Sequence, residues 1–173
     1  TEPLFLYVSF RAPHEPHEPA PEDKGEFAGF SYRGGAFNES DVSDKPAWVQ
    51  ATALLTDEQI KGLDQSNAGR LESLLSVDRV IAALVDRLEA EGRLDQTVIV
   101  VTSDNGQQWG EHRLLNKGVP YEESVHVPLL VWAPDLSPRR TDALIATNLD
   151  LAATVTDLAG LPARGDGQSF RDV

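Results

Sequence analysis

The stretch Thr97-Val-Ile-Val-Val-Thr-Ser-Asp-Asn-Gly106 decides the fold class of this chain. Its first part is rich in β-branched residues, a composition typical of a strand buried on both faces of a sheet. The segment before it, from about residue 66 to residue 91, carries apolar residues at helical spacing and ends before Gly92, a common helix stop. A helix that leads into a buried strand is half of a βαβ unit. The pattern therefore predicts an α/β fold, with a doubly wound, mostly parallel sheet flanked by helices.

Further elements are expected along the rest of the chain. They are a buried strand over residues 3–10, a surface loop over 22–44, a weakly helical segment over 45–62, a buried strand over 127–133, a short strand over 144–146 and a last helix that ends before Gly160. Asn148 or Asp150 is expected to cap this last helix. Residues 162–173 are polar and predict a loosely held tail. Because no internal repeat interrupts the pattern, we expect residues 1–173 to form a single domain.

The composition is that of a globular domain with an acidic balance. The 173 residues carry a formal net charge of −13, which disfavours nucleic acids and anionic membranes as partners because the protein's field repels them. No run approaches the roughly 18 apolar residues that a membrane span needs. The chain has no cysteine, which excludes disulfides and thiolate metal sites. It begins at Thr1 and has no methionine, so we expect a piece of a longer protein, whose localisation this sequence does not define.

The end of the predicted 97–103 strand carries oxygen ligands and, a short loop later, a cation. Asp104 and Asn105 offer one charged and one neutral oxygen, the kind of ligand that Ca²⁺ prefers. Lys117 could neutralise the oxygens of a bound anion or protonate a leaving oxygen, and ligands bind at such strand ends in open α/β sheets. The alternatives are that Ser103–Gly106 is only a turn and that Lys117 is a solvated loop lysine. Calcium takes about six to eight oxygens, so two donors leave the site incomplete.

Histidines and arginines add further candidates. A proline-rich stretch carries His14 and His17 with a glutamate after each, and such a group could bind Zn²⁺ or contact a substrate. His112 either contacts a substrate or shapes its own loop through a hydrogen bond. Arg11 and Arg113 could neutralise an anion.

The run T-S-D-N-G-x-x-x-G-E-H-R-L-x-x-K over Thr102–Lys117, followed by Y-E-E-S-x-x-V-P-L-L-V, resembles the second signature region of the sulfatase family. The stretch Leu4-Phe-Leu-Tyr-Val-Ser-Phe-Arg-Ala-Pro-His14 is similar to a family passage in which the histidine points at the sulfate. The resemblance continues through the 66–91 helix and Asn148–Thr154 to Gly165–Phe170, and so covers nearly the whole chain. It implies the fold of the alkaline phosphatase superfamily.

The resemblance also implies an activity and a site. The activity is hydrolysis of a sulfate ester, on a small molecule or a sulfated glycan. His14 and Lys117 would be catalytic and substrate-binding residues, His112 a further substrate contact, and Asp104 and Asn105 ligands of Ca²⁺.

Other parts of a sulfatase are missing from this chain. The family uses a formylglycine, made from the Cys or Ser of a C/S-x-P-x-R motif, as its nucleophile, and two consecutive aspartates after the first strand complete its calcium site. The chain has no cysteine and no Ser-x-Pro-x-Arg, since Ser137-Pro-Arg-Arg140 has the wrong spacing. We therefore expect the C-terminal portion of a sulfatase catalytic domain, without the N-terminal part that holds the formylglycine. The isolated chain would be inactive, with an incomplete calcium site.

Two other functions stay open. One is a phosphonate or phosphate ester hydrolase of the same superfamily, whose nucleophile would also lie outside this chain. The other is a non-catalytic domain that binds calcium or a protein partner. Strand edges and apolar faces left uncovered in a partial sheet also predict self-association. The loop over residues 22–44 is a candidate for substrate specificity.

Overall fold

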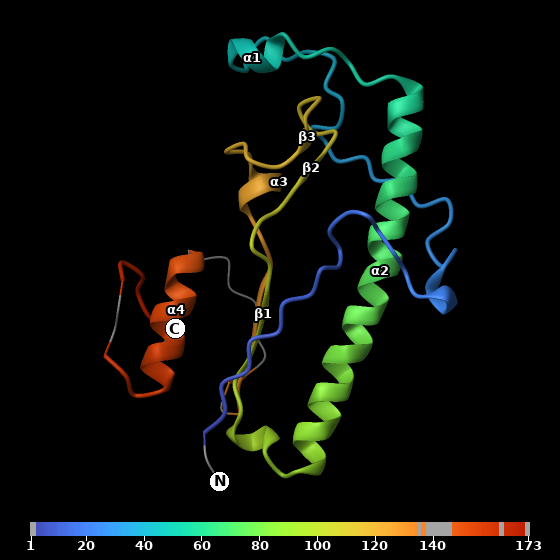
Figure 1. Cartoon of the computed structure of the whole chain (residues 1–173). Helices are drawn as coiled ribbons and strands as arrows, with labels where there is room; N and C mark the ends of the chain where they lie inside the picture. The colour runs from blue at the N-terminus through green and yellow to red at the C-terminus, as the bar shows by residue number, and fades with distance from the viewer. Residues whose placement is uncertain (1–2, 135, 138–146, 163–164, 172–173) are drawn as a thin grey trace. The chain divides into compact units, whose positions relative to one another are not determined.

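The computed structural model describes residues 3–134, 136–137, 147–162 and 165–171. Contacts divide the chain into two compact units, residues 1–134 and residues 135–173 (Figure 1). The short strand expected over residues 144–146 lies outside the described residues. The single domain expected over residues 1–173 stays a prediction.

Helix α2, Asp57–Ala90, is the longest element of the first unit (Figure 1). It begins nine residues earlier than the predicted 66–91 helix, because Thr56 and Gln59 form a capping box in which each side chain accepts a hydrogen bond from the other residue's backbone N–H. It ends where the sequence predicts. Gly92 has a φ of +63°, and the N–H groups of residues 92 and 93 return to carbonyls in the last helical turn. Among the described helices, none is long and apolar enough to cross a membrane.

The buried face of α2 is polar, which differs from the apolar stripe that the sequence predicts. Asn67, Glu72 and Ser73 are buried, whereas Val80 and Leu84 are 42% and 36% exposed. For Glu72 the reason is the loop over residues 22–44, which lies against the helix here. One carboxylate oxygen of Glu72 accepts hydrogen bonds from two backbone N–H groups of that loop, those of residues 25 and 27, at 3.0 and 3.4 Å. The loop itself runs through a short 3₁₀ turn, η1 (Pro21–Asp23).

The predicted strands over residues 97–103 and 127–133 are both present. They form β1, Ile99–Thr102, and β4, Leu129–Trp132, which pair antiparallel with Ile99 opposite Trp132. The α/β class is thus confirmed, although this pair does not show the parallel direction expected of most of the sheet. The prediction of a strand over residues 3–10 is wrong within the described residues. That segment has no regular secondary structure and no ladder partner there, and Phe5 and Tyr7 are 70% and 80% exposed.

A small hairpin and a compact loop region follow β1. Strands β2, Gln108–Trp109, and β3, Leu115–Asn116, pair antiparallel. The apolar cluster beside this region is made by Val42, Val49 and Leu114, with Val119 and Tyr121 packed against it. The remaining short elements are α1 (Ala47–Gln50), η2 (Leu94–Gln96) and α3 (Glu122–Val125). The weakly helical segment expected over residues 45–62 is divided. Its first part contains only the short helix α1, and its last part, from Asp57, belongs to α2.

The second unit is built on α4, Asn148–Leu158. Its N-cap is Thr147 and not Asn148 or Asp150. The carboxylate of Asp150 instead accepts a hydrogen bond from the Thr147 backbone N–H at 2.6 Å. Gly160, with a φ of +67°, ends the helix as predicted. Part of the 162–173 tail is hydrogen-bonded to α4, for example from the Phe170 N–H to the Thr154 hydroxyl at 3.1 Å. Its looseness in solution stays a prediction.

Candidate functional site

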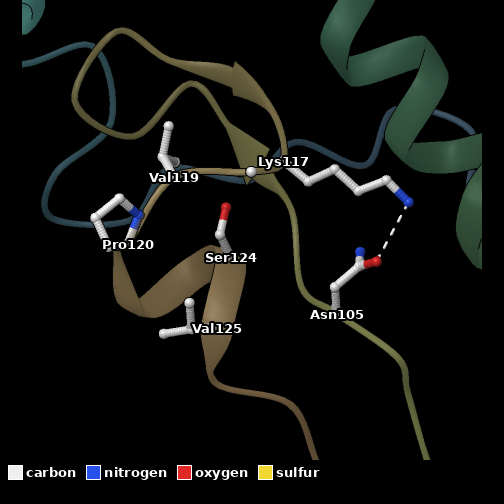
Figure 2. Close-up of a pocket in the computed structure, with 7 residues that line it drawn as sticks. Asn105, Lys117, Val119, Pro120, Ser124 and Val125 are labelled. Carbon is white, nitrogen blue, oxygen red and sulfur yellow. Dashed lines mark hydrogen bonds between the residues drawn. The ribbon is translucent and has the colours of Figure 1, made fainter.

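Asn105 and Lys117 meet at a pocket beyond the carboxyl end of β1. The ammonium group of Lys117 donates a hydrogen bond to the Asn105 side-chain oxygen at 3.3 Å (Figure 2). The pocket has a volume of about 470 Å³, and its other lining residues are Gly118, Val119, Pro120, Ser124 and Val125. The pocket therefore combines one cation and one carboxamide with a largely apolar wall. The sequence offered no signal for this wall, because its residues carry no charged group that would mark a site.

The backbone of α3 holds the Asn105 loop in place. The Gly106 N–H donates to the Ser124 carbonyl oxygen at 2.9 Å. A Cβ atom at position 106 would collide with the Glu123 carbonyl oxygen, so this close approach requires glycine. Because Ser124 also lines the pocket, the same contact sets the position of Asn105 relative to the opposite wall.

Asp104 precedes the pocket residue Asn105 and lies at a bend of the backbone. Its carboxylate accepts hydrogen bonds from the Asn105 backbone N–H at 2.8 Å and from the Ser103 hydroxyl at 3.4 Å. The backbone bends at Asp104 directly after β1, and no hydrogen-bonded turn is assigned over residues 103–106. The bend places the carboxylate at the end of β1, and the role of Asp104 as a metal ligand stays a prediction.

The oxygen donors at this strand end fit only part of a calcium site. Asp104 supplies a carboxylate and Asn105 an amide oxygen, but the amide oxygen already accepts from Lys117. No group of three or more His, Cys, Asp or Glu side chains placed to hold a metal occurs among the described residues. Since calcium takes about six to eight oxygens, these two residues could contribute to a site but could not form one alone.

The two histidines of the proline-rich stretch face different partners. His14 is exposed, and its Nδ1 lies 2.9 Å from the Glu15 carbonyl oxygen, so that nitrogen carries the proton. His14 is not among the residues that line the pocket. His17 instead contacts Ser66 on α2, with its Nε2 2.9 Å from the hydroxyl oxygen. The described residues therefore do not gather the four-group zinc site that the sequence allows.

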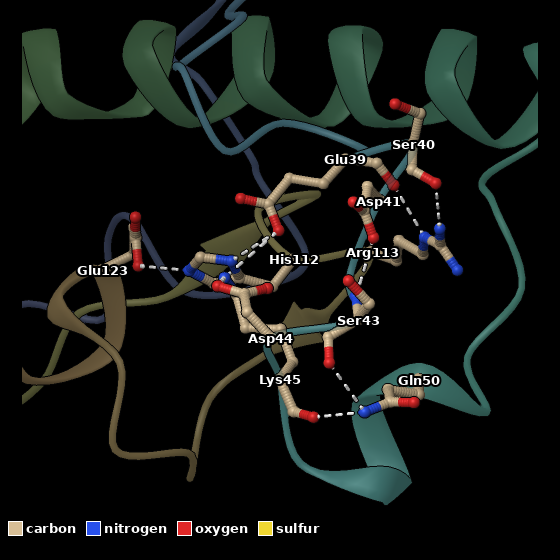
Figure 3. A network of polar contacts seen from close by, with 10 residues as sticks. All are labelled: Glu39, Ser40, Asp41, Ser43, Asp44, Lys45, Gln50, His112, Arg113 and Glu123. Atoms are coloured by element: carbon tan, nitrogen blue, oxygen red, sulfur yellow. Dashed lines mark hydrogen bonds and ion pairs between the residues drawn. The ribbon is translucent and has the colours of Figure 1, made fainter.

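His112 is enclosed by acidic and aromatic side chains. Its Nδ1 lies 3.2 Å from a carboxylate oxygen of Glu39 and its Nε2 lies 3.9 Å from one of Glu123 (Figure 3). The ring lies against Tyr121 with the centroids 4.3 Å apart, and only 13% of the side chain is exposed. Both ring nitrogens thus face carboxylates, an arrangement that favours the loop-shaping alternative. Substrate contact by His112 stays a prediction.

Arg113 fastens the same loop to the segment that precedes α2. Its guanidinium group donates to the carbonyl oxygens of Glu39, Ser40 and Thr52 at 2.8, 2.9 and 2.9 Å. Figure 3 shows the Glu39 and Ser40 contacts together with the His112 pair. Because its N–H donors bind backbone carbonyl oxygens, the geometry favours a role of Arg113 in holding the loop over a role in binding an anion. Both His112 and Arg113 have positive φ values, +54° and +63°, a conformation that sequence patterns do not predict for such residues.

The sequence matches the family described as Sulfatase over residues 1–161. Because this match covers most of an α/β chain with the site described above, the chain belongs to the Sulfatase family.

Relatives and solved structures agree with this assignment. The N-acetylglucosamine-6-sulfatase of Homo sapiens is 37% identical over 161 residues, which cover 92% of this chain and 29% of that protein. The enzyme of the same name from Capra hircus is 37% identical over 98% of this chain and 31% of its own length. The chain therefore spans less than one third of these relatives.

Two solved structures are similar in fold. One is BT4656 in complex with its substrate D-glucosamine-2-N,6-O-disulfate, with a TM-score of 0.61, 34% identity, and coverage of 72% of this chain and 26% of that one. The other is a phosphonate monoester hydrolase from Silicibacter pomeroyi, with a TM-score of 0.58, 30% identity, and coverage of 63% and 22%. Both sulfate and phosphonate ester chemistry thus occur on folds similar to this one.

Proposed function

We propose that this chain forms the part of a sulfatase active site that binds the sulfate group and the leaving oxygen of a sulfate ester. The observation that carries the proposal is the contact between Lys117 and Asn105 at the pocket beyond β1. A protein with a net charge of −13 repels anions at long range. A local cation held in a defined position is therefore what a sulfate ester would need at this site.

Lys117 has two roles in this proposal. Its ammonium group donates hydrogen bonds to sulfate oxygens and can give a proton to the oxygen of the departing alcohol. Asn105 orients it through the 3.3 Å hydrogen bond, which restricts the otherwise mobile side chain. His14, with an exposed ring, would approach the sulfate group from the proline-rich stretch and assist the leaving oxygen.

The remaining catalytic parts are proposed to come from outside this chain. Asp104 and Asn105 would contribute oxygens to a calcium ion, which when bound supplies positive charge beside the sulfate oxygens. A formylglycine nucleophile would come from another part of the longer polypeptide, since this chain has neither a cysteine nor the required Ser motif. We therefore expect the isolated chain to be inactive. Measurable hydrolysis of an aryl sulfate by this chain alone would contradict that expectation.

The proposed substrate is a sulfate ester on an amino sugar or a sulfated glycan. Support comes from the names of the similar proteins, two N-acetylglucosamine-6-sulfatases, and from the disulfated glucosamine bound to BT4656. The loop over residues 22–44 lies partly against the polar face of α2 and is the segment that we expect to vary with the substrate.

A second candidate is hydrolysis of phosphonate or phosphate esters, which the similarity to the phosphonate monoester hydrolase favours. The two candidate activities, sulfate ester and phosphonate ester hydrolysis, are distinguished by measuring kcat/KM of the full-length polypeptide for an aryl sulfate and for the matching phosphonate monoester. We expect preference for the sulfate ester. The reverse preference would replace the proposal by the second candidate, and no turnover of either would favour a calcium-binding or partner-binding domain.

Self-association of the isolated chain is a further proposal, for which the exposed apolar side chains give a reason. Leu4, Phe5, Leu6 and Tyr7 are each more than half exposed, as is Leu130 in β4. Such surface tends to be covered by another polypeptide. Sedimentation of the chain as a monomer at high concentration would count against it.

A further inference from the structure

Three polar residues of α2, namely Ser66, Asn67 and Arg70, lie where the helix contacts two loops that are far apart in the sequence. One loop is the proline-rich stretch that carries His14, and the other is the signature loop, residues 103–117, which carries Asn105 and Lys117. Their contact residues are His17 and Trp109, whose ring centroids lie 6.2 Å apart. Both rings lie against the same short stretch of α2, residues 66–70.

His17 fits closely against the helix. Its Nε2 lies 2.9 Å from the Ser66 hydroxyl oxygen, one turn before Gly69. A Cβ atom at position 69 would lie 3.2 Å from the His17 Cβ, closer than ordinary van der Waals contact. The helix therefore offers both a hydrogen-bond partner and a space without a side chain. The hydrogen bond to Ser66 and the close packing at Gly69 together fix the position of His17, three residues after His14.

Trp109 contacts the same stretch of α2 through the guanidinium group of Arg70. The guanidinium group of Arg70 lies over the indole, 4.3 Å from the ring centroid, and donates to the Asn67 side-chain oxygen at 2.5 Å. The Trp109 backbone N–H donates to a carboxylate oxygen of Glu111, which is 2% exposed, at 2.6 Å. Trp109 itself is 7% exposed and lies in β2, whose partner strand β3 ends one residue before Lys117.

Several polar atoms where the two loops contact α2 have no hydrogen-bond partner among the described residues. Within the described part of the chain, His17 Nδ1, Arg70 Nε and Trp109 Nε1 are buried and lack a hydrogen-bond partner. Burial also lowers the pKa of Arg70, an effect that the charge of Glu111 opposes. Unpaired buried nitrogens and a desolvated guanidinium cost stability, so stability alone gives no reason for a polar cluster where apolar packing would serve.

We propose that residues 66–70 of α2 are a platform that fixes the His14 loop and the Lys117 loop relative to each other. His17 is then a positioning residue that acts through the backbone it shares with His14. This inference rests on the proposed function only for its effect on catalysis. The platform itself, as two loops held at a set separation, can be tested without any activity.

The structural test uses the absence of cysteine from the chain. Spin labels are attached to Glu15→Cys and Leu115→Cys, both exposed positions, and the distribution of distances between them is measured by pulsed electron paramagnetic resonance. We expect a narrow distribution that broadens in His17→Ala and narrows again in His17→Gln, because the glutamine amide can replace Nε2 opposite Ser66. His126→Ala is the control, since that ring is exposed and pairs only with Glu122 in the contacts described. A broad distribution in the parent chain, or one that His17→Ala leaves unchanged, would overturn the platform.

The catalytic test uses the full-length polypeptide and a sulfate ester. We expect His17→Ala to lower kcat by about tenfold to a hundredfold with little change in KM, because a small displacement of His14 impairs the reaction more than binding. Ser66→Ala should give a similar loss, and the double variant should be no worse than either single one, since both remove one contact. His17→Gln should recover most of kcat.

The two tests separate the possible failures. If the labels show the platform but the polypeptide does not hydrolyse sulfate esters, the proposed function fails and the platform stands as a structural feature. If sulfate hydrolysis is present and kcat is unaffected by His17→Ala, the positioning role is refuted. The positioning role is also refuted if the loss of kcat only tracks a lower unfolding midpoint and His17→Gln does not recover it.

Discussion

Replacing Arg113 by alanine tests how the signature loop is held against the segment that precedes α2. The substitution removes three hydrogen bonds from a charged donor to the carbonyl oxygens of Glu39, Ser40 and Thr52. The bonds to Glu39 and Thr52 are partly buried, whereas the bond to Ser40 is exposed and counts for less. At about 1–1.5 kcal/mol for each of the first two and less for the third, the free energy of unfolding should fall by about 2–4 kcal/mol.

Urea unfolding followed by far-ultraviolet circular dichroism measures this change, because the signal is dominated by the 34-residue helix α2. With an m value of about 2 kcal/mol/M, the midpoint should fall by about 1–2 M urea. Arg113→Lys should lose more than half as much, since an ammonium group cannot reproduce the three-way fork. Arg87→Ala is the matched control. Arg87 is 74% exposed and pairs only with Glu91 in the contacts described, so its loss should stay near 0.5 kcal/mol or below.

Two outcomes would refute this reasoning. If Arg113→Ala unfolds within about 0.5 kcal/mol of the parent chain, the three carbonyl contacts do not hold the loop in solution. If Arg113→Lys is as stable as the parent, a single positive charge is sufficient and the fork geometry is irrelevant.

Three further predictions concern pH, packing and metal binding. The guanidinium of Arg79 holds the pKa of Asp23 below its ordinary value, so this stabilisation is present above about pH 4 and is lost as the pH falls through the lower folded-state pKa. Asp23→Asn should therefore flatten the dependence of the urea midpoint on pH in the acid range, and an unchanged slope would contradict it. Gly106→Ala should destabilise by about 1–3 kcal/mol because its Cβ meets the Glu123 carbonyl, whereas Gly62→Ala on α2, with no atom within 4 Å, should stabilise by about 0.5–1 kcal/mol. In calorimetric titration the chain should bind Ca²⁺ only weakly, and a dissociation constant below about 1 µM would disprove the incomplete site.

Local signals in the sequence account for the ends of the helices and for the class of the fold. Gly92 and Gly160 stop their helices through positive φ values that a glycine adopts without strain, and this can be predicted from one residue and its neighbours. The β-branched run before Asp104 forms β1 for an equally local reason. The direction of its pairing with β4 could not be predicted, because it depends on a strand about thirty residues later in the chain.

Contacts in the site that depend on partners far away in the sequence could likewise not be predicted. The position of Asn105 and Lys117 after one strand suggested a shared site, and the family resemblance assigned their roles, but no rule of spacing predicts a hydrogen bond between the lysine and the amide. The pairing of His112 with Glu39 crosses 73 positions and depends on left-handed backbone at His112, so neither partner nor geometry was available from the sequence. The polar face of α2 was missed for a related reason. An apolar stripe predicts a buried face, but the loop that actually covers Glu72 binds through its backbone N–H groups.

The most direct test of the central claim is the rate of sulfate ester hydrolysis by the full-length polypeptide with Lys117→Ala, compared with Lys61→Ala at an exposed position on α2. If Lys117 binds the sulfate and assists the leaving oxygen, kcat/KM should fall by about a hundredfold or more in the first variant and stay within about twofold in the second. The loss should be smaller for esters whose leaving alcohol is more acidic, because such a leaving group needs less proton donation. Equal activity of the two variants, or no sulfate ester hydrolysis by the parent polypeptide, would contradict the claim.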